Sequence, residues 1–173
     1  MTRFPMPGWR GAALGAFAAI LLYGASGVLA VPPADEAVQR LGRTDADMKV
    51  YKTATCGCCE SWVKRMRARG FTVEASDVPR PRLIEIKQKL GITRDTASCH
   101  TAVIDGYVVE GHVPARDIRQ LLHDRPDGVH GLAVPGMPVG SPGMEMGGRQ
   151  DPYDVIGLGA EGEGRIFSSY PRD

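Results

Sequence analysis

The stretch "TCGCCESW", from Thr55 to Trp62, places three of the chain's four cysteines within four residues. Directly before it, Met48 to Thr53 alternates apolar and polar residues, as a short strand does. Within and after it, four apolar residues recur at the spacing of one helix face: Cys59, Trp62, Val63 and Met66. Gly70 then marks the end of that helix. The stretch therefore predicts a junction at which a strand ends and a helix begins with thiols.

The segments that follow continue the alternation of strands and helices. Phe71 to Ala75 predicts a second strand, and the run from Pro81 to Gly91 predicts a second helix. "TAVI" and "YVV" flank Asp105-Gly106, the two-residue turn of an antiparallel hairpin. A third helix is predicted from about Pro114 through Leu122. The run 48 to 124 thus follows a β-α-β-α-β-β-α order, which is typical of an α/β fold with a central mixed sheet flanked by helices.

The composition changes sharply at residues 128–148, which hold seven glycines, three prolines and three methionines. Glycine and proline at this density disfavour helices and central strands, so a long loop is predicted. After it, Tyr153 to Leu158 and Arg165 to Tyr170 predict a final pair of strands.

The N-terminus has the pattern of a signal peptide. Arg3 and Arg10 precede an uncharged apolar run, and "GVLA" ends in small residues, so residues 1–30 predict export with cleavage after Ala30. The alternative is an uncleaved anchor in the inner membrane. Residues 31–47 are polar and rich in proline and alanine, which predicts a flexible tether before a domain at 48–173.

Charge gives no reason to expect a nucleic-acid partner. Without residues 1–30 the chain keeps 19 basic and 20 acidic residues, a formal charge of −1. The basic stretch of the first helix, with Lys64, Arg65, Arg67 and Arg69, is typical of a solvated helix face.

The cysteines leave several interpretations open. A thiol at the start of a helix is stabilised as thiolate, which both attacks disulfides and binds metals. Cys56 and Cys59 have the C-x-x-C spacing of a thiol-disulfide oxidoreductase, whereas three adjacent soft donors favour a metal. Two structural disulfides are the third alternative, because export leads to an oxidising compartment. A bridge between the adjacent Cys58 and Cys59 would be strained, which weakens that alternative.

The fourth cysteine lies in "SCHT", Ser98 to Thr101, just before the predicted hairpin. With the element order, this arrangement resembles a thioredoxin-type fold, in which the loop before the third strand packs against the C-x-x-C and carries a cis-proline. This chain has Cys99-His100 there and no proline. The resemblance implies that the Cys99 thiol and the His100 imidazole face the cysteine-rich loop.

Three motifs together resemble the CopG-type copper-resistance proteins of the bacterial periplasm: "KTATCGCC", "SCHTAVIDGYVVEGHVP" and "LAVPGMPVGSPGMEMG". The resemblance covers about residues 48 to 170. It implies a thioredoxin-like domain that binds copper through cysteines, including as a multinuclear cluster. It also implies copper handling in the periplasm, with another copper protein or an exporter as partner, more than it implies an enzyme.

Ligand chemistry agrees with copper. Cu(I) prefers thiolate and thioether sulfur, while a zinc site of Cys₄ or Cys₃His type would leave the methionines of the loop without a role. The predicted metal ligands are Cys56, Cys58, Cys59 and Cys99, with His100, Met137, Met144 and Met146 as auxiliary donors. Met66 belongs to the core face of the first helix.

The other histidines receive weaker assignments. His112 is interpreted as a cap or surface residue before the third helix, and His123 lies near the C-terminus of that helix, where positive charge is favourable. His130 heads the glycine-rich loop as a weaker ligand candidate.

Overall fold

The computed structural model describes residues 47–159 and 164–171, so the predicted signal peptide and nearly all of the tether lie outside the described residues. Its elements follow one another as β1 (Met48–Lys52), α2 (Gly57–Ala68), β2 (Val73–Asp77), α3 (Arg80–Lys89), β3 (Thr101–Ile104), β4 (Tyr107–Glu110), α4 (Ala115–Asp124), β5 (Gly131–Ala133), β6 (Tyr153–Leu158) and β7 (Gly164–Tyr170). The predicted order from β1 to α4 is confirmed, as is the final strand pair β6 and β7.

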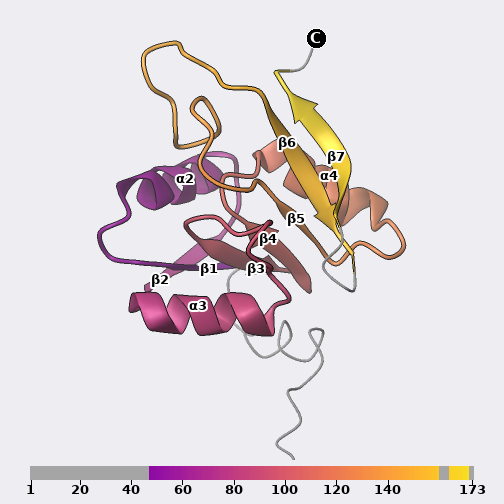
Figure 1. The fold of residues 1–173 in the computed structure, drawn as a ribbon, viewed down its shortest axis with the longest axis horizontal. Coiled ribbons are helices and arrows are strands. Elements are labelled where there is room, and N and C mark those ends of the chain that lie inside the picture. Colours follow the sequence, from indigo (N-terminus) through magenta and orange to yellow (C-terminus); the bar gives the residue numbers. More distant parts are fainter. Residues whose placement is uncertain (1–46, 160–163, 172–173) are drawn as a thin grey trace, which may run out of the picture. The chain divides into compact units, whose positions relative to one another are not determined.

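The seven strands of the described residues form one mixed sheet in the order β2-β1-β3-β4-β5-β6-β7 (Figure 1). β1 pairs in parallel with β2, as the α2 crossover requires, and antiparallel with β3. β4 pairs in parallel with β5, and the remaining neighbours are antiparallel. β1 and β3 are antiparallel neighbours, and Tyr51 lies opposite Thr101. The loop that follows β1 and the loop that precedes β3 therefore lie at the same end of these two strands.

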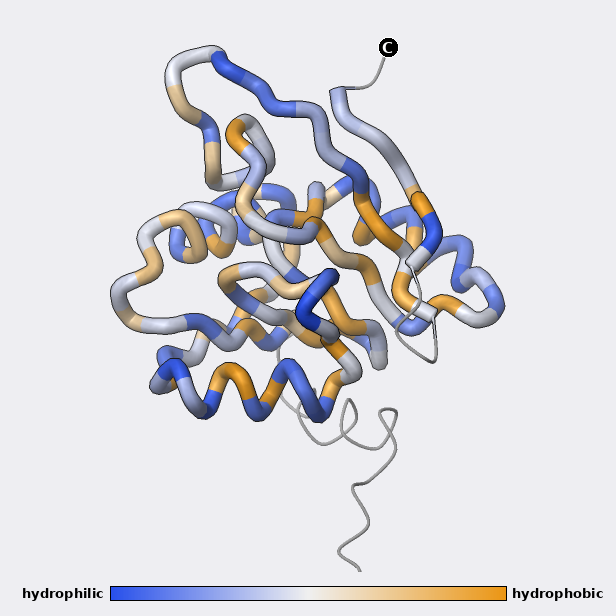
Figure 2. The backbone as a smooth tube through the Cα atoms, in the orientation of Figure 1, coloured by the Kyte–Doolittle hydropathy of each residue, from blue (hydrophilic) through white to orange (hydrophobic). Residues whose placement is uncertain are grey.

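Alternation along the strands divides the core between the two faces of the sheet. Val50 packs in the cluster that includes Trp62 of α2, whereas the next residue, Tyr51, packs in the cluster of α3. The helices α2 and α4 therefore cover one face and α3 covers the other (Figure 1). Figure 2 shows apolar and polar residues alternating along α3, of which Leu83 and Ile86 belong to the core cluster while Ile84 is exposed.

The predicted core face of α2 is confirmed. All four of its apolar residues are buried: Cys59, Trp62, Val63 and Met66. The indole Nε1 of Trp62 donates a hydrogen bond to the carbonyl oxygen of Val113 at 2.9 Å, which ties α2 to the segment between β4 and α4. This bond fixes the helix start, and with it the cysteines, relative to the hairpin.

The predicted hairpin turn is also confirmed. Asp105 and Gly106 both have positive φ, 46° and 82°, as a two-residue turn of this kind needs. The hairpin register pairs Thr101 with Glu110. Residues just before β3 consequently lie opposite residues just after β4.

The expectation that residues 128–148 hold no central strand is wrong. β5 lies between β4 and β6 and is fully buried. Gly131 explains the exception, because a Cβ at this position would lie 2.4 Å from the carbonyl oxygen of Val108. A glycine that disfavours strands in general is required here by the close approach of two backbones.

The architecture is α/β and thioredoxin-like, with β5, β6 and β7 extending the sheet. Among the described residues, none of the helices has the length and apolar character needed to span a bilayer.

Candidate metal centre

The first three cysteines lie where β1 passes into α2. Cys56 occupies the N-cap position, where no side chain caps the helix, and Cys58 and Cys59 belong to its first turn. Cys59 is fully buried, while Cys56 and Cys58 are half-buried. The helix start therefore presents two partly accessible sulfur atoms and one buried sulfur atom.

Cys99 reaches these cysteines from the loop before β3. The sulfur atoms of Cys56, Cys58, Cys59 and Cys99 all lie within 4.8 Å of one another. Although some forty residues separate Cys99 from the others in the chain, the fold brings the four sulfur atoms to one place. The thioredoxin-type arrangement predicts this convergence, and the geometry confirms it.

Two of the four cysteines are oxidised in the structure. Cys56 and Cys59 form a disulfide, whereas Cys58 and Cys99 are free thiols. The sulfur of Cys58 lies 3.5 Å from that of Cys56. A disulfide sulfur is not a thiolate ligand, so the four-thiol set exists only when this bond is reduced.

The free thiol of Cys99 keeps its proton. Burial, followed by the neighbouring Cys58, raises the pKa of Cys99 to about 12. A metal ion that binds this sulfur must therefore displace a proton at neutral pH.

Two imidazoles contact the Cys99 sulfur. Nδ1 of His100 lies 3.2 Å from it and Nε2 of His112 lies 3.1 Å from it. Burial lowers the pKa of both histidines, and His112 further lowers the pKa of His100, so both rings are neutral at pH 7. Cys99, His100 and His112 form a second group whose ligand atoms lie within 4.8 Å of one another.

The interpretation of His112 as a cap or surface residue is wrong. The ring is fully buried, and its Nδ1 donates to the carbonyl oxygen of Pro142 at 2.8 Å. Since Nδ1 carries the proton of the neutral ring, Nε2 presents its lone pair to Cys99. The hairpin register contains the missed signal, because continuing the Thr101–Glu110 pairing by two residues places Cys99 opposite His112.

The remaining histidines lie elsewhere. His123 is exposed on α4 and pairs with Asp124. The backbone of His130 pairs with Val108 at the opposite end of β4 from His112. Neither belongs to the groups of potential ligands within the described residues.

The glycine-rich loop packs against the start of α2. A Cβ on Gly143 would lie 2.8 Å from the backbone nitrogen of Trp62 and 2.9 Å from the carbonyl oxygen of Cys58. Its backbone φ of +88° also favours glycine. This contact places Pro142 where its carbonyl can accept the hydrogen bond from His112.

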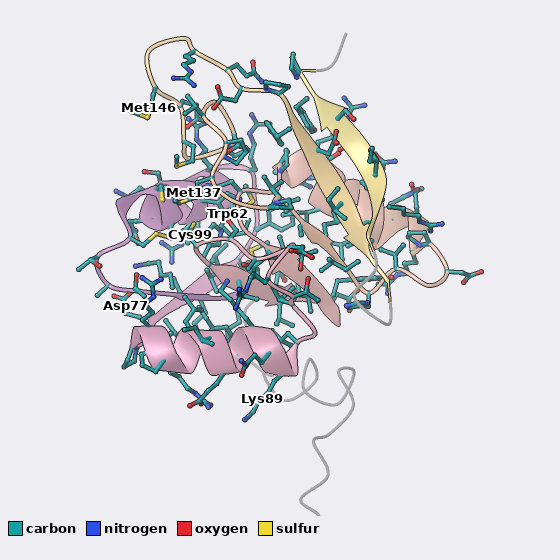
Figure 3. The ribbon with its side chains drawn as sticks, viewed as in Figure 1. Trp62, Asp77, Lys89, Cys99, Met137 and Met146 are labelled. Carbon is teal, nitrogen blue, oxygen red and sulfur yellow. A yellow bond between two sulfur atoms is a disulfide. The ribbon has the colours of Figure 1, made fainter. Side chains whose placement is uncertain are left out.

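The three predicted methionine donors differ in position. Met137 lines a pocket together with Cys56 and Cys99, although its side chain is 53% exposed. Met144 is half-buried, and Met146 is 63% exposed. Figure 3 shows Met146 apart from Cys99 and Met137, at the outer part of the loop. Met137 is thus the methionine that the fold brings to the opening of the cysteine site.

This pocket has a volume of about 490 Å³ and connects the cysteines with the surface beside α3. Its lining is largely apolar, with two basic residues: Thr53, Cys56, Arg80, Leu83, Ile84, Lys87, Ala97, Ser98, Cys99, Gly136 and Met137. Cys56 lines it but the fully buried Cys59 does not. The pocket is therefore the route by which a small molecule can reach the sulfur of Cys56.

A buried polar network, which sequence reasoning missed, supports the Cys99 loop. The Glu110 carboxylate accepts hydrogen bonds from the Ser98 amide and the Thr101 hydroxyl, both at 2.6 Å, and from the Lys87 ammonium. Burial raises the pKa of Glu110, while Lys87 lowers it. Since Ser98 directly precedes Cys99, this carboxylate holds the backbone from which the thiol projects.

Comparisons with known proteins agree with this geometry. A family model described as "Protein of unknown function, DUF411" matches residues 96–144. Two solved structures named "Copper resistance protein copG", Form 2 and Form 1, are 48% and 47% identical to the chain, each with a TM-score of 0.66. Each match covers 72% of this chain and 97% of the other chain. No curated protein sequence matches the chain.

Proposed function

The chain belongs to the CopG-type family of copper-resistance proteins, and from this premise we propose that its reduced form holds Cu(I) through four cysteine thiolates. The sulfur ligands are Cys56, Cys58, Cys59 and Cys99. His100 and one or more of Met137, Met144 and Met146 are auxiliary donors, and the structure adds His112 to this set. Copper is the cargo, which the protein sequesters or passes on as part of copper resistance.

One observation carries the proposal, namely that the four sulfur atoms lie within 4.8 Å of one another. Thiolates are the ligands that Cu(I) prefers, and a thiolate sulfur can bridge two ions. Four thiolates this close together can therefore hold more than one ion, as a multinuclear thiolate cluster. Zinc is less well suited, because the thioether of Met137 beside the cysteines adds a donor that zinc sites do not use.

The site is prepared in two steps. An external dithiol reductant gives two electrons and two protons to the Cys56–Cys59 disulfide and becomes a disulfide itself, which supplies two further thiols, and uptake of metal then removes the proton from Cys99. The neutral imidazoles of His100 and His112 lie at hydrogen-bond distance from that sulfur, where they can accept the proton or ligate the metal.

A Cu(I) titration of the reduced protein tests the proposal. Under anaerobic conditions and against a competing chelator, the wild type is expected to take up copper and Cys99→Ser is expected to take up less. Ser61→Ala is the matched control, because Ser61 bonds only the Gly57 carbonyl on the exposed side of the same helix. Absence of uptake with all four thiols reduced, or equal uptake by Cys99→Ser and wild type, contradicts the proposal.

The observed disulfide favours a second candidate function, thiol-disulfide exchange. In this reaction a substrate thiolate attacks the accessible Cys56 sulfur, a mixed disulfide forms, and the Cys59 thiolate leaves. A second substrate thiolate then releases Cys56, so two substrate thiols become one disulfide and the protein gains two thiols. One contact argues against this function. The backbone of Gly136 pairs with Ala97 and Ser98, so the segment that precedes β3 is already covered where an exchange substrate would have to bind.

A disulfide-reduction assay separates the two functions. Exchange through Cys56 and Cys59 predicts that Cys56→Ser abolishes turnover and Cys58→Ser does not. The copper proposal predicts that both substitutions lower Cu(I) uptake. Turnover that is negligible in the wild type excludes the second candidate.

The site of action is part of the proposal. We place the mature domain in the periplasm, after export directed by residues 1–30 and cleavage after Ala30, with residues 31–47 as a tether. A periplasmic copper protein or exporter is the expected partner. Intact mass of the protein from a periplasmic fraction tests this, since a chain that keeps residues 1–30 in the membrane fraction indicates an anchor instead.

A further inference from the structure

A second pocket lies on the α2 and α4 side of the sheet. It has a volume of about 330 Å³, and its walls come from α2, the start of α4, the glycine-rich loop and the β6–β7 pair. The lining residues are Arg65, Met66, Arg69, Pro114, Ala115, Arg116, Gly140, Pro142, Glu145, Gln150, Tyr153 and Tyr170. None of the four cysteines lines it, so it is separate from the candidate metal centre.

The pocket is strongly basic. Three arginines and one glutamate are among its lining residues, which leaves a surplus of two formal positive charges. Arg65 pairs with Glu145 at 2.9 Å, so a carboxylate already binds one of the three guanidinium groups. Within residues 47–159 and 164–171, the side chains of Arg69 and Arg116 have no hydrogen-bond or ion-pair partner.

The remaining walls give the pocket a fixed shape. Tyr153 and Tyr170 stack with ring centroids 4.9 Å apart, and the Tyr170 hydroxyl donates to Asp117 at 2.5 Å. Glu145 accepts from the Gly143 amide at 2.9 Å as well as pairing with Arg65, so the loop wall is held to α2. Two exposed arginines, Arg69 and Arg116, therefore line a preformed space with no side-chain partner among the described residues.

We propose that this pocket binds a small dianionic oxyanion, either inorganic phosphate or a short dicarboxylate, through Arg69 and Arg116. The guanidinium group binds carboxylate and phosphate oxygens in a bidentate manner, and two such groups match the charge of a dianion. A volume of about 330 Å³ is at the small end of ligand sites, which suits a ligand of this size. This inference does not depend on the copper function.

The bound anion would also contact the loop that supports the metal centre. Pro142 lines the pocket, and its carbonyl accepts the hydrogen bond from His112. Occupancy is therefore expected to change the backbone resonances of Gly140 and Gly143, in addition to those of the arginines.

Titration of the metal-free protein by NMR at low ionic strength tests the proposal, with inorganic phosphate and succinate in separate experiments. We expect saturable shifts at Arg69, Arg116 and Gly140 with at least one of the two anions, and the anion that binds identifies the ligand class. Arg69→Gln and Arg116→Gln should each weaken binding about tenfold, the effect of losing one charge-assisted contact. Added sodium chloride should weaken binding further.

Arg67→Gln is the matched control, because Arg67 lies on the same helix, carries the same charge and bonds the Val73 carbonyl outside the pocket. Should a glutamine variant fail to fold, Arg116→Lys keeps the charge without the bidentate geometry, and a partial loss of affinity is expected. Two results overturn the proposal: shifts that do not saturate with either anion, or an Arg67→Gln variant that loses as much affinity as Arg69→Gln.

Discussion

At the scale of single residues, His112 is the site residue whose position differs most from the one that the sequence predicts. Its Nε2 lies 3.1 Å from the Cys99 sulfur, and its orientation is fixed by the Pro142 carbonyl. In the proposed copper site, such an imidazole would either ligate the metal or orient the thiolate that does.

We therefore predict that His112→Ala lowers Cu(I) affinity by about 10- to 100-fold, the range found when a group that ligates or orients a ligand is removed. Competition with a chelator under anaerobic conditions measures this. His123→Ala is the control, because His123 is an exposed histidine of α4 that pairs only with Asp124. Equal Cu(I) affinities of the two variants would show that His112 does not contribute to copper binding.

Glu110 carries the second prediction at this scale. Glu110→Gln leaves the ammonium of Lys87 buried without its carboxylate, so unfolding free energy should fall by about 3–5 kcal/mol. Glu85→Gln, which breaks the exposed pair with Arg82, should cost about 0–1 kcal/mol. Urea unfolding compares the two, and a loss for Glu110→Gln as small as that for Glu85→Gln would refute the structural role.

The double variant Lys87→Met, Glu110→Gln refines this prediction. It removes both charges, so it should recover part of the stability that Glu110→Gln loses. It should nevertheless retain a defect in Cu(I) uptake, because the neutral glutamine oxygen is a weaker acceptor than the carboxylate for the Ser98 amide that fixes the Cys99 loop.

Residue identity alone could predict a cysteine cluster but not its surroundings. Cys56, Cys58 and Cys59 lie within four residues of the sequence, and soft donors in that pattern favour a soft metal or a redox centre. His112 and Glu110 act through tertiary contacts across the hairpin, and the motif that contains them, "SCHTAVIDGYVVEGHVP", does not by itself assign either residue a role. Only the pairing of Thr101 with Glu110, applied beyond the hairpin, indicates that His112 faces Cys99.

At the scale of elements, periodicity predicted the helices and most of the strands. The core faces of α2 and α3 follow a 3.6-residue spacing, and β3 with β4 follows from the Asp105-Gly106 turn. β5 could not be predicted because its three residues include a glycine and lie in a glycine- and proline-rich segment. Its strand character comes from pairing with β4 and β6, which local sequence does not encode.

The glycine-rich loop yields a prediction at this scale. Gly143→Ala places a methyl group 2.8 Å from the Trp62 nitrogen at a φ of +88°, so the loop must move away from α2. Unfolding free energy should fall by about 1–3 kcal/mol for the overlap. Cu(I) affinity should fall too, since Pro142 would no longer fix His112.

Gly147→Ala is a close control for this substitution. Gly147 also has positive φ, +59°, but nothing lies within 4 Å of its Cβ position. It should share the backbone strain of Gly143→Ala without the overlap, and it should leave Cu(I) affinity unchanged. Chelator competition and urea unfolding measure both quantities, and identical behaviour of the two variants would show that the loop contact does not support the site.

At the scale of the whole molecule, the fold buries two imidazole rings against one sulfur atom. His100 and His112 are fully buried, and their folded-state pKa values lie below the ordinary value of 6.5. The unfolded chain therefore binds protons at these histidines at a higher pH than the folded chain does. The two histidines therefore make their full contribution to the stability of the metal-free protein above pH 6.5. This contribution is lost as the pH falls from 6.5 towards the folded-state pKa values.

We predict that unfolding free energy of the metal-free protein decreases between pH 7 and pH 5, with a slope of at most about 1.4 kcal/mol per pH unit for each histidine. Urea unfolding at several pH values measures the slope. His112→Gln should reduce the slope, because glutamine does not titrate. A slope that His112→Gln does not alter would show that its burial is not coupled to folding in this pH range. Bound Cu(I) should steepen the slope, because the folded, metal-bound protein holds fewer protons on its thiols and imidazoles than the unfolded, metal-free chain does.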